Sequence, residues 1–242
     1  MDKLSAIQLA MISVLFSCCG SHSDKENRNE KKETDGTGKS VIVRKPLNIT
    51  SEFNQISNLG SIDIIYSQGD FLAELVGDST LVNLIDADID SNILSLSLKG
   101  ERNKDINVYD GTNKITLELR TPNLKCVALC SNGSFRSTGT WKGQDIQLGI
   151  IGSGNFDIDT IECATFDYQA TGTGTANIRH IISDAASVTC ASASNVNADV
   201  NTETLKAAST SGKITITGKA GKKKIYESED NLIDDKTTSA NL

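Results

Sequence analysis

The chain has 242 residues, of which 19 are glycine, two are proline and 5% are aromatic. Its formal net charge of −7 at pH 7 disfavours nucleic acid or an anionic membrane surface as the main partner, because both repel an acidic protein. The length suits one large domain or two small ones. Frequent Val, Ile, Thr, Ser and Gly residues favour short strands joined by tight turns over helices.

The first residues resemble a bacterial lipoprotein signal. Lys3 precedes an apolar stretch over residues 4–16, which is too short to span a bilayer but suits the core of a signal peptide. The stretch ends in Leu15-Phe16-Ser17-Cys18, which is similar to the lipobox, in which the cysteine thiol is acylated and becomes the mature N-terminus. We therefore predict a cleaved signal peptide over residues 1–17 and lipidation of Cys18.

A polar segment follows. Residues 21–39 contain no aliphatic or aromatic side chain, so they cannot bury enough apolar surface to offset the entropy lost on ordering. We predict that residues 18–40 form a disordered tether that holds the body of the protein off a membrane.

The body, residues 41–220, shows the alternation of apolar and polar residues that is typical of strands. The clearest predicted strands cover residues 61–66, 92–98 and 114–119. No sustained helical period occurs, and the nearest approach to one is short, at residues 81–89. Residues 221–242 carry many charges and are predicted to be a disordered tail.

The second half of the body repeats itself, which is the signature of a repeat architecture. Triplets of small residues recur with their last residues 21, 20, 20 and 18 positions apart. They are Ser131-Asn132-Gly133, Gly152-Ser153-Gly154, Gly172-Thr173-Gly174, Ser192-Ala193-Ser194 and Thr210-Ser211-Gly212. Alternating residues flank most triplets, so each unit reads as a strand, a bend, a second strand and a turn.

Two architectures fit this repeat, an antiparallel β-sandwich and a right-handed parallel β-helix-like solenoid with rungs of about 20 residues. The solenoid explains more, because it places the same residue type at the same position in successive rungs. Small residues suit its bends, where each side chain meets its copy about 4.8 Å above and below. Glycine also permits the positive φ that such a corner could require.

The repeat register also bears on the cysteines. Cys190 aligns with Leu129, Ile150 and Ala170, so it is predicted to be a buried inward thiol. Pairings among Cys126, Cys130, Cys163 and Cys190 are excluded by distance or by the lack of an aligned partner. We therefore predict no disulfide in the body.

The bends, together with Phe53-x-x-Ile56, Ile62-Asp63-Ile64 and Thr121-Pro122-x-Leu124, resemble the DUF2807 family. Its members are described as "putative auto-transporter adhesin head (GIN) domain" proteins and are common among exported proteins of Bacteroidota. The resemblance covers residues 45–220. It implies a β-helical fold and an adhesive role, and it supplies no catalytic residues.

A carbohydrate-active enzyme on a β-helix would need paired carboxylates, or a base and a cation. Asp157 and Asp159 share the outward side of one predicted strand, and Asp167 is expected one rung away. We interpret them as a solvated face. His180 is predicted to be solvated in a turn. Trp141 is predicted to cover one end of the core, with stacking on a sugar as the alternative.

The sequence thus predicts no catalytic, cofactor-binding or metal-binding residues. The leading hypothesis is a non-catalytic cell-envelope protein, anchored by its lipid to the outer membrane, that binds a glycan or protein ligand and no nucleic acid. Two alternatives also fit the sequence. One is a carbohydrate-active β-helix enzyme, and the other is a structural envelope protein that assembles by pairing of strand edges.

Overall fold

The computed structural model describes residues 41–49, 51–99 and 114–239. The expected signal peptide, the tether and Cys18 lie outside the described residues. Within the described ranges, no helix is both long and apolar enough to cross a membrane.

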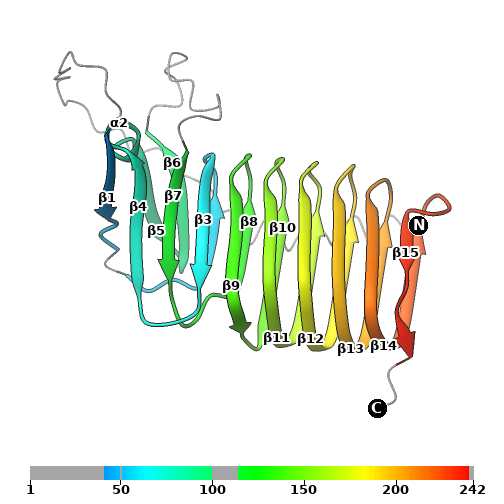
Figure 1. Cartoon of the computed structure of the whole chain (residues 1–242). Helices are drawn as coiled ribbons and strands as arrows, with labels where there is room; N and C mark the ends of the chain where they lie inside the picture. Colours follow the sequence, from blue (N-terminus) through cyan, green and yellow to red (C-terminus); the bar gives the residue numbers. More distant parts are fainter. Residues whose placement is uncertain (1–40, 50, 100–113, 240–242) are drawn as a thin grey trace.

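From β8 (Cys126–Leu129) onward, the chain forms a stack of parallel rungs (Figure 1). The four longest strands follow one another along the stack, and each pairs in parallel with the strand before it. They are β11 (Asn155–Ala170), β12 (Thr175–Cys190), β13 (Asn195–Ser209) and β14 (Lys213–Glu227). The predicted β-solenoid is therefore confirmed, and the sandwich alternative is wrong.

Each rung contributes to two walls because the long strands bend near their middle. The first half of β11 pairs with β9 (Ser134–Lys142), and its second half pairs with β10 (Asp145–Ile150). We call the wall that contains β9 and the first halves of β11 to β14 the first wall. The second wall contains β8, β10 and the second halves. The strands of both walls belong to one continuous ladder, since the long strands run from one wall into the other.

Shorter strands build the N-terminal end of the solenoid. The first wall continues from β9 into β3 (Ile62–Ser67), β7 (Ile115–Arg120), β4 (Leu72–Asp78) and β1 (Ile42–Pro46). The second wall continues from β8 into β2 (Gln55–Asn58), β6 (Ile93–Leu98) and β5 (Ile85–Asp90). β3, β6 and β7 confirm the three strands expected from the sequence.

This end departs from parallel stacking. The pairs β1–β4, β4–β7 and β5–β6 are antiparallel. A one-turn helix, α2 (Ser79–Val82), joins β4 to β5, and its first turn is capped by Asp78, which accepts a hydrogen bond from the backbone N–H of Thr80 at 2.8 Å. The antiparallel strands and their turns give the N-terminal end a surface unlike that of the regular rungs.

The core lies between the two walls, and aromatic side chains cluster near its middle. Phe135 lies 5.8 Å from both Tyr66 and Phe156, measured between ring centroids. Trp141 packs on Tyr66 at 5.1 Å and is 1% exposed, and its indole N–H donates to the carbonyl of Leu124 at 2.9 Å. The ring is therefore part of the core, and stacking of Trp141 on a sugar is ruled out.

The bends place successive backbones in very close contact. A Cβ added to Gly172 would lie 1.8 Å from the carbonyl oxygen of Gly152, and one added to Gly174 would lie 1.8 Å from that of Gly154. Among the described glycines, positive φ occurs at Gly139 and Gly218 and not at these bends. The suggestion that the bends need positive φ is therefore wrong, and lack of space for a Cβ explains these glycines.

The cysteines follow the register only in part. Cys190 is paired with Ala170 in the ladder and is fully buried, as predicted. Cys163 and Cys190 are free thiols, whereas Cys126 is disulfide-bonded. The prediction of no disulfide is thus wrong for Cys126. The distance argument considered only pairs among the four cysteines of the body.

The C-terminal segment, expected to be disordered, is ordered over residues 221–239. β14 extends to Glu227, and β15 (Ile233–Asp235) and β16 (Thr238–Ser239) add to the first wall. Lys223 takes the register position of the buried Leu205. Its ammonium group donates to Asp235 at 2.8 Å and to Thr237 at 3.0 Å. These polar contacts cap the open end of the core, as a solenoid requires.

The bends yield a prediction for stability. Gly172→Ala forces the rung away from Gly152 and weakens the hydrogen bond from Thr173 N to Gly152 O, now 3.0 Å. We expect the free energy of unfolding to fall by about 3 kcal/mol, the upper end of the range for overpacking. Urea unfolding followed by the fluorescence of the single tryptophan measures it. Gly69→Ala is the control, since its Cβ would meet nothing within 4 Å; equal losses in both variants would contradict the explanation.

The cap yields a pH dependence. Burial raises the pKa of Asp235, but hydrogen bonds from Lys223 and Thr237 outweigh burial, so the pKa lies below its ordinary value of 3.8. A lowered carboxyl pKa stabilises the fold above the unfolded pKa, and that contribution is lost as the pH falls through the folded pKa. We expect Asp235→Asn to be less stable than wild type at about pH 6, with the difference shrinking below about pH 4.

Chemical denaturation of both proteins across this pH range checks the prediction. Asp230→Asn, which changes an exposed carboxylate in the turn after β14, is the matched control. A difference between wild type and Asp235→Asn that stays constant down to low pH would show that the carboxylate charge does not stabilise the cap.

Candidate functional site

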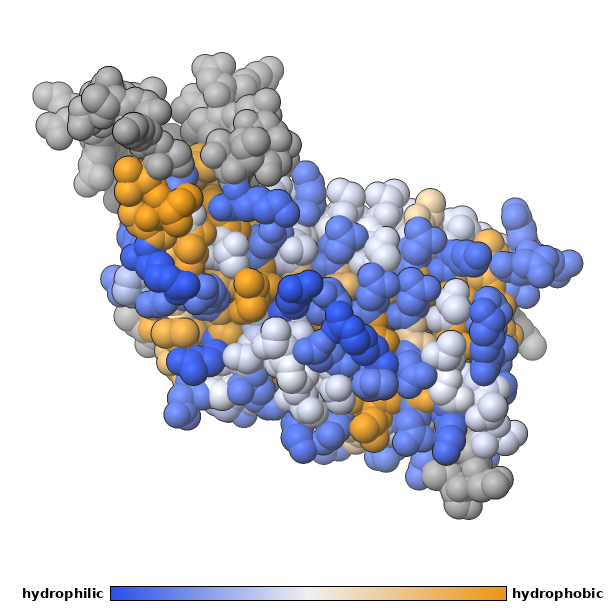
Figure 2. All heavy atoms as spheres, viewed as in Figure 1, coloured by the Kyte–Doolittle hydropathy of each residue, from blue (hydrophilic) through white to orange (hydrophobic). Residues whose placement is uncertain are grey.

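The outward side chains of the first wall form a broad polar surface. In β11 the inward neighbours Phe156 and Ile158 are buried, so Asp157 and Asp159 lie on the outside, as the alternation predicts. We call the outward side chains of β9 and of the first halves of β11 to β14 the polar face. Figure 2 shows that this side of the rungs is largely hydrophilic.

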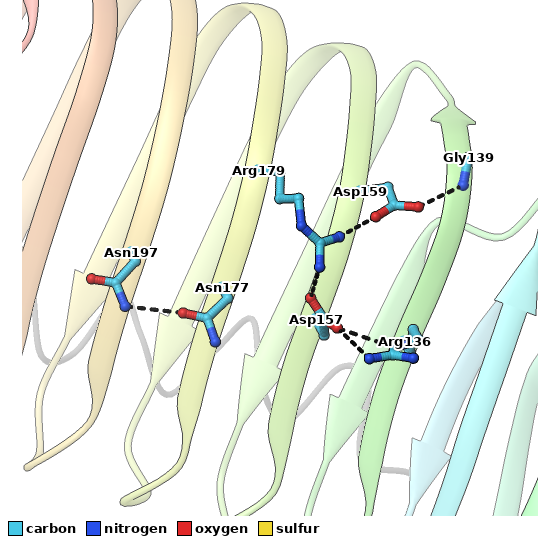
Figure 3. Close-up of polar contacts among 7 residues, drawn as sticks. All are labelled: Arg136, Gly139, Asp157, Asp159, Asn177, Arg179 and Asn197. Atoms are coloured by element: carbon cyan, nitrogen blue, oxygen red, sulfur yellow. Dashed lines mark hydrogen bonds and ion pairs between the residues drawn. The ribbon is translucent and has the colours of Figure 1, made fainter.

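Two arginines and two aspartates form a cluster on the polar face (Figure 3). Arg136 Nε donates to Asp157 Oδ2 at 3.0 Å, and Arg179 Nη2 donates to Asp157 Oδ1 at 3.0 Å. Arg179 also pairs with Asp159. The second oxygen of Asp159 accepts a hydrogen bond from the backbone N–H of Gly139 at 3.0 Å.

The cluster is balanced in charge and involves three successive rungs. Two carboxylates two residues apart on one strand repel each other, and Arg179, one rung further along, contacts both of them. Each ion pair is partly solvated, so it contributes at most about 1 kcal/mol to stability. Asp157 and Asp159 are therefore hydrogen-bond acceptors for guanidinium groups.

Next to the cluster, the polar face carries a pair of asparagines. The side-chain amide of Asn197 donates to the carbonyl oxygen of Asn177, one rung away, at 2.9 Å (Figure 3). Asn155 accepts a hydrogen bond from the backbone N–H of Thr175 at 3.0 Å. Within the described residues, the amide nitrogen of Asn177 and the carbonyl oxygen of Asn197 have no further partner, so both remain open to a ligand.

His180 lies on strand β12 rather than in the turn expected from the sequence. Its Nδ1 is 3.4 Å from a carboxylate oxygen of Asp199, whose other oxygen accepts a hydrogen bond from Thr217 at 2.8 Å. The imidazole is well exposed, which agrees with the expected solvated histidine.

The three carboxylates considered for catalysis are not brought together. Asp157 and Asp159 lie on the first wall, whereas Asp167 pairs with Gln147 of β10 on the second wall. Gln169 donates to Asp167 at 2.5 Å. Position in the sequence suggested adjacency, but the bend in β11 puts the core between them.

The free thiols are held in their neutral form. Burial, with a smaller contribution from Asp145 and Asp184, raises the pKa of Cys163 to about 12. Burial also raises the pKa of Cys190 to about 11. Because the thiolate is the reactive form, both cysteines act as apolar packing groups at neutral pH.

Sequence reasoning missed Arg136 and Arg179, although a signal for both was present. Arg136 and Asp157 are each the third residue after a small-residue triplet, and Asp159 and Arg179 are each the fifth. The register of the ladder pairs Arg136 directly with Asp157. Comparing charges at equal distances from the triplets would have found the cluster.

No group of three or more His, Cys, Asp or Glu side chains in the described parts of the chain is placed to hold a metal ion. Cys18, the predicted lipidation site, falls outside those parts.

Several solved structures share the fold. A crystal structure described as a putative adhesin from Bacteroides fragilis has 18% identity and a TM-score of 0.62, covering 83% of this chain and 97% of that one. One described as a putative lipid binding protein from Parabacteroides distasonis has 14% identity and a TM-score of 0.52, covering 82% and 95%. A putative adhesin from Parabacteroides merdae has 18% identity and a TM-score of 0.50, with the same coverage.

No curated protein matches the chain significantly. The sequence does match one family, described as "Putative auto-transporter adhesin, head GIN domain", over residues 52–179, which is more than half of the chain. The resemblance seen in the bends and in the Thr121-Pro122 segment is thereby confirmed, and the chain belongs to the DUF2807 family.

Proposed function

We propose that this protein is a lipid-anchored, non-catalytic adhesin of the cell envelope that binds a glycan or protein ligand on its polar face. The observation that carries the proposal is the asparagine pair of the polar face, whose open amide groups are repeated at the spacing of the rungs beside a charge-balanced cluster. Two of the similar structures are described as putative adhesins, which supports an adhesive role.

The pairing of the carboxylates argues against the enzyme alternative. A glycoside hydrolase needs one carboxyl group to deliver a proton and a second to act as base or nucleophile. On the polar face Asp157 accepts hydrogen bonds from two guanidinium groups and Asp159 from one guanidinium group and a backbone N–H. Both carboxylates are therefore engaged in contacts within the chain, which disfavours a role in contacting a substrate.

The C-terminal edge of the second wall argues against assembly by strand pairing. That edge is the second half of β14, which contains Lys222, Lys223 and Lys224. Lysines on an edge strand disfavour the addition of another strand, because their ammonium groups would have to be desolvated. A protein that binds its ligand as a monomer fits this edge better.

The polar-face proposal predicts the effect of removing the asparagine pair. The labelled chain is tested on an array of glycans and immobilised matrix proteins, and we expect binding to at least one of them. Asn177→Ala with Asn197→Ala should weaken that binding about thirtyfold, since two hydrogen bonds of about 1 kcal/mol each are lost. The control, Ser187→Ala with Lys206→Ala, changes two outward neighbours on the second wall. No binding by wild type, or an equal loss in the control, would contradict the proposal.

Lipid anchoring predicts a labelling result. In bacteria fed radioactive palmitate, the wild-type chain should take up label and partition with membranes. Cys18→Ala should abolish both, because the acylated thiol is gone, whereas Cys19→Ala should keep them. Label retained by Cys18→Ala would show that the lipobox assignment is wrong.

A further inference from the structure

A cleft of about 500 Å³ lies at the N-terminal end of the solenoid, away from the polar face described above. It is formed by residues 49 and 51–54 between β1 and β2, the connection from β3 to β4, the β5–β6 turn and the connection from β7 to β8. Its volume is within the range of small-molecule sites in proteins. Four segments that are distant in the sequence thus build one concave site.

An exposed aromatic ring forms one side of this cleft. Phe71, in the connection from β3 to β4, is 51% exposed, whereas Phe53 is 7% exposed. The two rings meet edge to face, with centroids 6.4 Å apart and planes at 80°. Because the buried ring supports the exposed one, Phe71 presents a fixed apolar surface to the cleft.

Three asparagines, Asn54, Asn92 and Asn123, also line the cleft. Among the described residues, their side-chain amides make no hydrogen bond. Their backbones are nevertheless held in place: Asn54 N donates to Asn92 O at 3.1 Å, and Lys125 N donates to Asn54 O at 2.7 Å. Each amide offers donors and an acceptor on a rigid frame.

The walls of the cleft are braced by further hydrogen bonds. Gln68 Nε2 donates to the carbonyl of Pro122 at 2.7 Å and to that of Lys142 at 2.8 Å. The hydroxyl of Tyr66 donates to the carbonyl of Thr121 at 3.1 Å. The end of β3 and the connection from β3 to β4 are thereby tied to the connection after β7, so little ordering is required of the cleft when a ligand binds.

The chemistry of the lining selects the ligand class. Glu52 is the one charged side chain among the described residues that line the cleft, so an anionic ligand would meet no cation there. A fully apolar ligand would leave the amides unpaired, which is costly on desolvation. A neutral sugar satisfies both features, because its C–H face packs on an aromatic ring while its hydroxyl groups pair with amides.

We propose that this cleft binds a neutral saccharide, with the sugar ring against Phe71 and its hydroxyl groups on Asn54, Asn92 and Asn123. The inference rests on the proposed adhesive function, and it names a ligand class and a site separate from the polar face.

The test uses the mature full-length chain and an array of neutral oligosaccharides, followed by titration calorimetry with the saccharide that binds best. Phe71→Ala should weaken binding at least tenfold, and Asn123→Ala should weaken it several-fold. Ile182→Ala is the matched control, since it removes a similarly exposed apolar side chain far along the solenoid, and it should leave affinity unchanged.

A second variant gives a local signal. Phe71→Trp keeps an aromatic ring in the cleft, so it should retain binding, and its exposed indole should shift to shorter emission wavelength when the saccharide is added. Trp141 is buried in the core, so the shift reports on the cleft. Unchanged emission at saturating saccharide would overturn the proposal.

Other results of these binding experiments distinguish the cleft proposal from the proposed adhesive function of the polar face. If the paired substitutions Asn177→Ala and Asn197→Ala remove saccharide binding while Phe71→Ala does not, the cleft proposal fails and the polar face remains the adhesive site. The same holds if wild type binds matrix proteins but no saccharide, or if a fatty acid binds the cleft in place of sugar. If wild type binds nothing on either array, both proposals fail.

Discussion

The structure depends on the close approach of successive backbones at the bends of the solenoid. Parallel strands stack about 4.8 Å apart, and at the bends the backbone of one rung contacts the carbonyl oxygens of the rung before it, as at Gly152 and Gly172. That contact leaves no room for larger side chains. It also holds the rungs in register, so that each residue lies beside its counterpart in the next rung.

Strict register has consequences on both sides of the walls. Inside, large and small side chains follow one another along a row, as Phe156 and Ala176 do, and the volume of the core is shared among neighbours. Outside, like charges in one row would repel, and the polar face instead alternates Arg136 with Asp157 and brings Arg179 to two carboxylates. The charge balance of this face is therefore a consequence of stacking.

The two ends of the solenoid depart from regular parallel stacking in different ways. At the C-terminal end, Lys223 and Asp235 close the core with a hydrogen-bonded ion pair, and charged residues of the last segment become part of the fold. At the N-terminal end, antiparallel strands replace parallel rungs. Their turns are free of the spacing that the bends impose, and so they can surround a cleft whose lining combines Phe71 with asparagine amides.

The sequence by itself determined the features that repeat: the rungs of about 20 residues, the small bends, the inward position of Cys190 and the family. Periodicity reveals these because one local rule is applied in every rung. It did not reveal the reason for the bend glycines or the order of residues 221–239, since each depends on a contact with a distant part of the chain, and it did not reveal the disulfide of Cys126. Only the tertiary structure decided that Asp167 lies apart from Asp157, and that Phe53, Phe71, Asn92 and Pro122 meet, because turns bring together residues whose separation follows no period.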